Sequence, residues 1–169
     1  MHFLDLKKRD FKKQSGFTLI ELIVSLLMLI GILQIFLLIS ASVNSSSTLR
    51  DGLVAANLAQ EGIEVVRNIR DRDFFLGNAF GASLPNGSWR VQWNSNALLA
   101  LSGNLPLKKD STTKFFSYDF GPDTIFRRKI DIFNVSANEI RIISTVDWDV
   151  RSISKTISAE AHLFNWYQP

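Results

Sequence analysis

The sequence contains no cysteine and only two histidines, His2 and His162. The lack of cysteine excludes disulfide bonds and thiolate metal sites. His162 lies in an alternating pattern typical of a strand, so we interpret it as a solvent-facing structural residue. No metal-spaced histidine cluster, nucleophile elbow or phosphate-binding loop is recognisable. We therefore expect neither an enzyme nor a chain with a cofactor or metal.

Charge is also missing from a long segment near the N-terminus. Between Phe17 and Leu49 the only charged residue is Glu21. The apolar run from Leu22 to Ala41 has the roughly 20 residues that a helix needs to cross about 30 Å of hydrocarbon. The sequence therefore predicts one membrane-spanning helix followed by one small globular domain.

Positive charge precedes this span. Residues 1–16 contain five basic side chains against Asp5 and Asp10, and their net charge of +3 equals that of the whole chain. Such a segment holds its end of the chain in the cytoplasm and sends the rest outward. Because the basicity belongs to this segment, the pI near 9.3 gives little support to nucleic-acid binding. The alternative is a secretory signal cleaved near Ser40-Ala41-Ser42, but such apolar regions are normally about 7–15 residues long.

The boundary between the two segments has a specific motif. Gly16, then Phe17, then Thr18-Leu19-Ile20-Glu21-Leu22, all after a basic leader, closely resembles the processing motif of type IV prepilins and type II secretion pseudopilins. The resemblance implies that prepilin peptidase cuts after Gly16 and methylates the new amino group of Phe17. Glycine suits the cut because, without a Cβ, its backbone can lie extended and close to a protease.

Glu21 requires an explanation, because a lone ionised side chain near the bilayer interior costs about 2.5–3.5 kcal/mol. Cleavage would create a cationic α-amino group on Phe17, one helical turn away. The resemblance implies an assembly salt bridge between Glu21 and the Phe17 amine of a neighbouring filament subunit. An intrachain pair or a protonated Glu21 is the alternative.

The resemblance covers about Lys7 to Ile39. Many pilins carry a helix-bending proline in the second half of the span, whereas this sequence has none there and Gly31 is its weakest point. The segment Leu58 to Arg67 is similar to a recurrent sequence of minor-pilin-like proteins, which implies a minor subunit.

An amphipathic helix is predicted over residues 44–70. The poor helix formers Asn44 to Thr48 permit a break, although we favour a continuous helix. A buried stripe is expected at three- to four-residue steps. Its members are Leu49, Leu53, Ala56, Ile63 and Val66.

The remaining residues, 71–169, read as a glycine-containing loop and an antiparallel sheet. The strand signals are Trp89–Trp93, Lys114–Tyr118, Ile125–Val135, Ile140–Val150 and Ile153–Leu163. The last three predict a meander packed against the helix, an α+β class, which is also the pilin fold that the resemblance implies. The expected organisation is a leader (1–16), a membrane and assembly helix (17–43), an amphipathic helix (44–70) and a globular domain (71–169).

Other candidate sites are weaker. Asp119 and Asp123 flank a Gly-Pro turn that could offer oxygen ligands to calcium, but a plain turn is the commoner explanation. Asp147 and Asp149 are best explained as the exposed face of a strand. A further group of aromatic and basic residues could form a nucleic-acid-binding surface: Trp89, Arg90, Trp93 and Arg127-Arg128-Lys129. We do not favour this interpretation, because aromatic residues on strands usually belong to the core and short basic runs usually lie on a solvated edge.

Two classes of function follow. The first is a structural subunit of a type IV pilus or pseudopilus, with prepilin peptidase, other pilin subunits and the membrane as partners. The second is a membrane-anchored extracellular binding domain that does not polymerise. Both place the chain in the cell membrane with its globular domain outside the cytoplasm.

Overall fold

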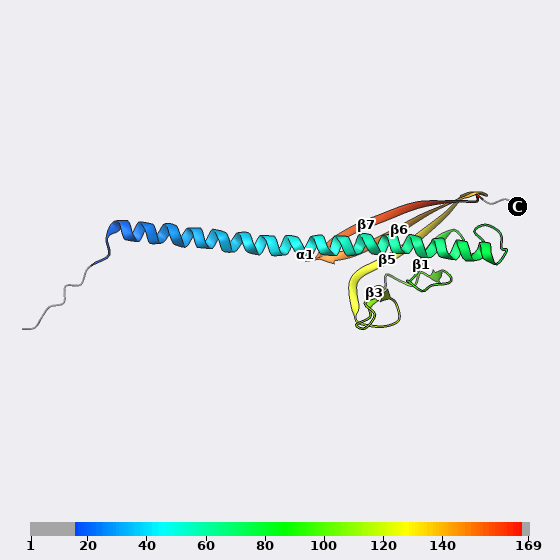
Figure 1. Cartoon of the computed structure of the whole chain (residues 1–169), viewed down its shortest axis with the longest axis horizontal. Helices are drawn as coiled ribbons and strands as arrows, with labels where there is room; N and C mark the ends of the chain where they lie inside the picture. The colour runs from blue at the N-terminus through cyan, green and yellow to red at the C-terminus, as the bar shows by residue number, and fades with distance from the viewer. Residues whose placement is uncertain (1–15, 167–169) are drawn as a thin grey trace, which may run out of the picture. The chain divides into compact units, whose positions relative to one another are not determined.

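The computed structural model describes residues 16–166. The chain has two compact units that divide between Ser45 and Ser46, and each is described by itself. Within the described residues, one helix, α1 (Leu19–Phe75), precedes seven strands that form an antiparallel sheet (Figure 1). The expected α+β, pilin-like arrangement of a long N-terminal helix and an antiparallel sheet is confirmed.

In the first unit, α1 begins at Leu19 and carries large apolar side chains on every side. Its large side chains from Leu19 to Val43 are all exposed. The helix passes through Gly31 and through Asn44–Thr48 without a break, so the favoured continuity is confirmed. By length and composition α1 is able to cross a membrane, and none of its most apolar window is buried.

In the second unit, α1 ends at Phe75 and not near Arg70, so the loop predicted to begin at Asp71 starts later. Asp73 explains the end of the helix. Its buried carboxylate accepts hydrogen bonds from Ser83 N (2.9 Å), Ser83 Oγ (2.7 Å) and Asn78 Nδ2 (3.2 Å). Burial raises the pKa of Asp73, but these hydrogen bonds outweigh it and leave the pKa below its usual value. The chain then turns at Gly77, whose φ is +72°.

The sheet is built around one long central strand. It comprises β1 (Gly87–Arg90), β2 (Leu99–Ala100), β3 (Pro106–Lys109), β4 (Phe116–Ser117), β5 (Asp123–Ser136), β6 (Glu139–Val150) and β7 (Ile153–Phe164). One edge of β5 pairs with β6, which in turn pairs with β7. The other edge of β5 pairs with β3 over its first half and with β1 over its second half. The predicted meander is confirmed as β5, β6 and β7.

The smaller strands differ from expectation. Trp89–Trp93 is a strand only as far as Arg90, because Gln92 and Ser95 close a turn. Of Lys114–Tyr118, only Phe116–Ser117 is strand, since the φ of Lys114 is +66° in a turn that starts at Asp110. Strands β2 and β3 were not predicted from the sequence. They have two and four residues, too few for an alternating pattern to show, and they are strands because β2 pairs with β1 and β3 pairs with β4 and β5.

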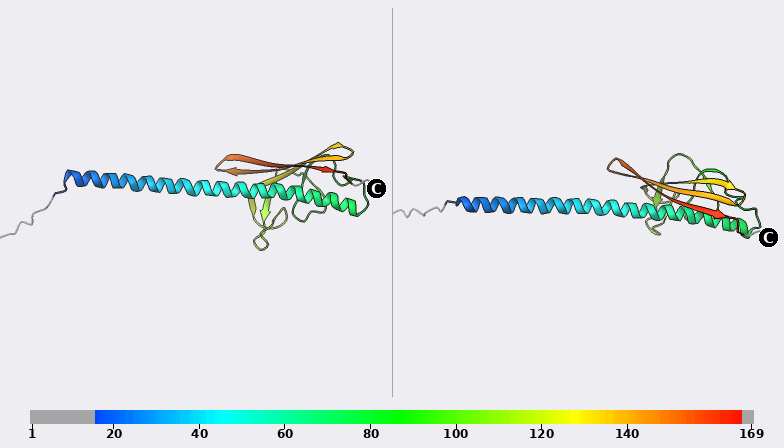
Figure 2. Two further views of the ribbon diagram at one scale, coloured as in Figure 1. Left: turned by 45° about the horizontal axis from the view of Figure 1, so that its top comes forward. Right: turned by 90° about the horizontal axis from the view of Figure 1, so that it is seen from above.

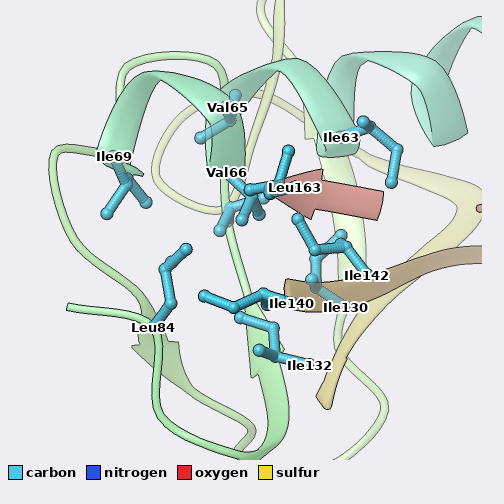
Figure 3. Packing of buried hydrophobic residues seen from close by; sticks show 11 residues of the cluster. Ile63, Val65, Val66, Ile69, Leu84, Ile130, Ile132, Ile140, Ile142 and Leu163 are labelled. Atoms are coloured by element: carbon cyan, nitrogen blue, oxygen red, sulfur yellow. The ribbon is translucent and has the colours of Figure 1, made fainter. Parts of the chain in front are cut away.

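The core of the second unit lies between α1 and the inner face of the sheet. Figures 1 and 2 show β5, β6 and β7 beside this part of α1 in every view. Apolar residues of α1 pack on isoleucines of β5 and β6 and on Leu84 and Leu163 (Figure 3). A second cluster joins α1 to β3, β5 and β6. The helical members of the two clusters are Ala55, Leu58, Ala59, Ile63, Val65, Val66 and Ile69.

The predicted stripe on α1 was therefore partly wrong. Ile63 and Val66 are buried, but Leu49 and Leu53 are 67% and 68% exposed. Around the helix axis, at about 100° per residue, Leu49 and Leu53 lie roughly 100° and 140° from the buried face centred on Ala55, Ala59 and Val66. Ala56 is half-buried, and the fully buried small residues Ala55 and Ala59 were not in the predicted stripe.

Gly62 sets the approach of α1 to the sheet. A Cβ on Gly62 would lie 2.4 Å from Ser144 Oγ and 2.8 Å from Ile130 Cδ1. Both distances are shorter than real Cβ contacts, so only glycine fits here unless the side chains of Ser144 and Ile130 shift. Gly62 thus allows this face of α1 to lie directly on β5 and β6.

Arg128 also joins the helix to the sheet. It was expected to lie on a solvated edge, but it is 2% exposed because it lies two positions from Phe126 and from Ile130 and therefore shares their inward face of β5. Its guanidinium donates hydrogen bonds to the Leu58 carbonyl (2.9 Å), Glu61 Oε1 (3.0 Å) and the Val91 carbonyl (2.7 Å). A buried charge must be paired in this way, so Arg128 fixes how α1 lies on the sheet.

Candidate processing and assembly site

The start of α1 brings the predicted site residues together. Gly16, Phe17 and Thr18 precede the helix, and all three are exposed. The carbonyl of Thr18 accepts the first helical hydrogen bond, from Leu22 N at 3.2 Å. The Thr18 hydroxyl accepts one from Glu21 N at 3.4 Å. Thr18 is therefore the N-cap of α1.

Glu21 lies in the first turn of this helix. Negative charge is favourable there, because the unpaired N–H groups at a helix N-terminus give it a partial positive charge. The Ser25 hydroxyl donates to the Glu21 carbonyl oxygen. A shallow groove of about 290 Å³ on the helix surface is lined by Ile20, Glu21, Val24, Ser25 and Met28. Glu21 is thus the one acidic group on an uncovered and mainly apolar face of the first turns of α1.

Sequence reasoning identified Gly16, Phe17 and Glu21 but missed Thr18. The signal was present, because Thr18-x-x-Glu21 matches the capping-box pattern that opens many helices. His2 and the basic residues of the leader lie outside the described residues, as does every residue before Gly16.

The other candidates lie elsewhere in the second unit. His162 is on the outward face of β7, as predicted, with Nδ1 2.6 Å from Glu139 Oε1 and Nε2 3.2 Å from Glu160 Oε1. Hydrogen bonds with Glu139 and then Glu160 raise the pKa of His162. The two carboxylates contact different ring nitrogens, so the three groups do not converge on one point.

Three of the four predicted acidic positions have side-chain partners among the described residues: Asp119, Asp147 and Asp149. Asp119 accepts a hydrogen bond from Gln92 Nε2 (2.6 Å), and Asp123 begins β5. Asp147 and Asp149 lie on the outward face of β6, as predicted, with Thr156 and Arg127 as partners. Within residues 16–166, no group of three or more histidines and acidic residues is arranged to hold a metal ion.

The aromatic and basic positions do not form one surface. Trp89 packs against the core, whereas Trp93, expected in the core, is 46% exposed and stacks on Phe115 with ring centroids 4.8 Å apart. Lys129 and Arg127 pair with Asp131 and Asp149 on the outer face, while Arg128 is buried. The basic run is therefore divided between the two faces of the sheet.

Comparison with known proteins gives one result that bears on the site. Residues 11–33 match the family model described as the prokaryotic N-terminal methylation motif, which is the signature of type IV prepilins and pseudopilins. The match covers Lys12 and Lys13, the Gly16-Phe17 junction and the first turns of α1. A search of curated proteins and a search of solved structures each found no significant match.

Proposed function

We propose that this chain, which carries the signature of type IV prepilins and pseudopilins, is a minor structural subunit of a type IV pilus or pseudopilus. The observation that supports this most strongly is where the motif lies. Residues 11–33 cover the start of α1, with the Gly16-Phe17 bond outside the helix and Glu21 in its first turn. Proteins with this motif are structural subunits and not enzymes.

Processing by prepilin peptidase would remove residues 1–16 and leave an N-methylated Phe17 as the first residue. The basic leader would hold this end in the cytoplasm until the cut, since positive charge favours that side. The apolar part of α1 would span the membrane, and the second unit would lie outside the cytoplasm.

Assembly would then use the uncovered apolar surface of α1. In this proposal, Glu21 pairs with the Phe17 ammonium of an adjacent subunit, which satisfies both charges in a water-poor environment. Leu49 and Leu53, near the start of the second unit, are also exposed apolar side chains. Contact between helices of neighbouring subunits would cover them.

The test is the mass of the mature protein, produced together with a prepilin peptidase. The wild type should begin at a methylated Phe17. Gly16→Leu should leave the uncut precursor in the membrane, because a bulky side chain prevents close approach of the scissile bond. Gly31→Leu is the matched control, since Gly31 lies inside α1 with nothing within 4 Å of its ideal Cβ, and it should be cut normally.

Two results would contradict the proposal. A mature start near Ser42 would indicate ordinary secretion. A wild-type chain that keeps Met1 in the presence of an active peptidase would indicate an uncleaved membrane anchor.

A further inference from the structure

We propose that Thr18 is a positioning residue for processing, because its cap starts α1 at Leu19 and keeps the Gly16-Phe17 peptide bond outside the helix. The inference rests on the proposed cleavage after Gly16. It adds a residue that acts on the scissile bond through backbone conformation and not through contact with the peptidase.

The geometry of the cap supports this role. Thr18 provides two acceptors to the first turn, its carbonyl for Leu22 N and its hydroxyl for Glu21 N. The first N–H groups of a helix have no partner within the helix, so a side-chain acceptor at this position fixes where the helix begins. Glu21, at the third helical position, adds favourable negative charge. The Thr18-x-x-Glu21 pair therefore favours a start at Leu19.

The scissile bond lies just before this start. Gly16, Phe17 and Thr18 are non-helical and exposed, and an ideal Cβ on Gly16 would meet nothing within 4 Å. A backbone segment that is free of helical hydrogen bonds is the kind that proteases cut. Processing therefore benefits from a helix that stops short of Phe17.

Without the cap, the next residue able to start a helix is Gly16. Phe17 and Leu19 are poor N-caps, whereas glycine is a fair one. A helix starting from Gly16 would make the Gly16 carbonyl, the reacting group of the cut, an acceptor for Ile20 N. Loss of the Thr18 cap should therefore slow cleavage by withdrawing the bond into the helix.

The test compares the rate at which purified prepilin peptidase removes the leader from full-length precursor in lipid vesicles. Residue 18 is replaced by good caps (Ser, Asn), by Gly, or by poor caps (Ala, Val). The Thr18→Ser and Thr18→Asn precursors should be cut at the wild-type rate. The Thr18→Ala and Thr18→Val precursors should be cut about fivefold more slowly, the factor that corresponds to a lost N-cap.

The glycine variant separates capping from direct recognition. Glycine has no hydroxyl, yet as an N-cap it is only slightly worse than threonine. Thr18→Gly should therefore be cut at close to the wild-type rate and faster than Thr18→Ala. Ser25→Ala is the matched control, because it removes a hydroxyl about two turns further along the helix and leaves the cap intact. Ser25→Ala should also be cut at the wild-type rate.

A spectroscopic measurement accompanies the rates. The 13Cα chemical shift of Phe17 should be coil-like in the wild type and helix-like in Thr18→Ala. If Thr18→Gly is as slow as Thr18→Ala, the peptidase recognises the side chain and the inference is wrong. Wild-type rates for Ala and Val, or slow variants with a coil-like Phe17, would also overturn it. A wild-type chain that is never cut after Gly16 would instead refute the proposed function.

Discussion

Under the proposed processing, Glu21 would have one favourable electrostatic partner before the cut and a second one after it. In the precursor, the helix N-terminus offers positive potential to its carboxylate. After the proposed cleavage, the ammonium of Phe17 adds a full charge one turn away. Because Glu21 is the only charged residue between Phe17 and Leu49, no other side chain in that stretch could take its role.

We predict that Glu21→Leu inserts into the membrane normally but does not enter filaments. Removing the carboxylate from an apolar segment favours insertion. In a filament, however, the Phe17 amine of a neighbour would be buried without a partner, and breaking such a pair typically costs about 3–5 kcal/mol. The measurement compares sheared filaments with membranes when the mutant is the only copy. Ser25→Leu, which lines the same groove, should assemble normally, and wild-type incorporation of Glu21→Leu would exclude the pairing.

His162 should make stability depend on pH. Because its folded pKa is raised above the reference value of 6.5, its contribution is fully present below pH 6.5 and is lost as the pH rises through the folded pKa. Charged groups facing it are Glu139 and Arg141 on β6 and Glu160 on β7. The melting temperature of the full chain in detergent should exceed that of His162→Gln at pH 5.5, and the gap should narrow by pH 8.5. A gap that does not change with pH would contradict this assignment.

At the scale of the element, the sequence was most informative where the hydrophobic pattern is long. The strict alternation in β6 predicts a half-buried strand, and the long apolar run of α1 predicts a helix. Arg128 and Gly62 were missed because their positions depend on contacts between elements far apart in the sequence. The alternation around Phe126 and Ile130 places residue 128 on the inner face of β5. A charged side chain is nevertheless expected to be exposed to solvent unless the groups that pair with it are known.

Gly62→Ala should destabilise the second unit by about 1–3 kcal/mol, the usual cost of overpacking a filled core. Gly52→Ala is the matched control in the same helix, because nothing lies within 4 Å of its ideal Cβ. Replacing an unhindered helical glycine should stabilise the protein by roughly 0.5–1 kcal/mol. Urea unfolding of the full chain in detergent would measure both changes. Equal effects of the two substitutions would show that α1 is not closely packed at Gly62.

At the scale of the molecule, the sheet of the second unit requires α1 as its cover. Ile130, Ile132, Ile140 and Ile142 on its inner face pack against Ile63, Val66 and other residues of the helix. We predict that a fragment starting at Ser46 is monomeric and unfolds cooperatively, whereas one starting at Asp71 aggregates, because an exposed apolar sheet face has no other cover. Size-exclusion chromatography and thermal unfolding distinguish the two. A soluble, cooperatively folded fragment from Asp71 would refute this view.

The central claim is that the chain is a processed subunit that enters a filament. It is tested most directly by mass spectrometry of the N-terminal peptide of this protein in filaments sheared from the cell surface. We predict a peptide that begins at Phe17 and carries a methyl group on its amine. The account would be contradicted if the protein occurred only in the membrane fraction, or if its first residue there were Met1 or lay near Ser42.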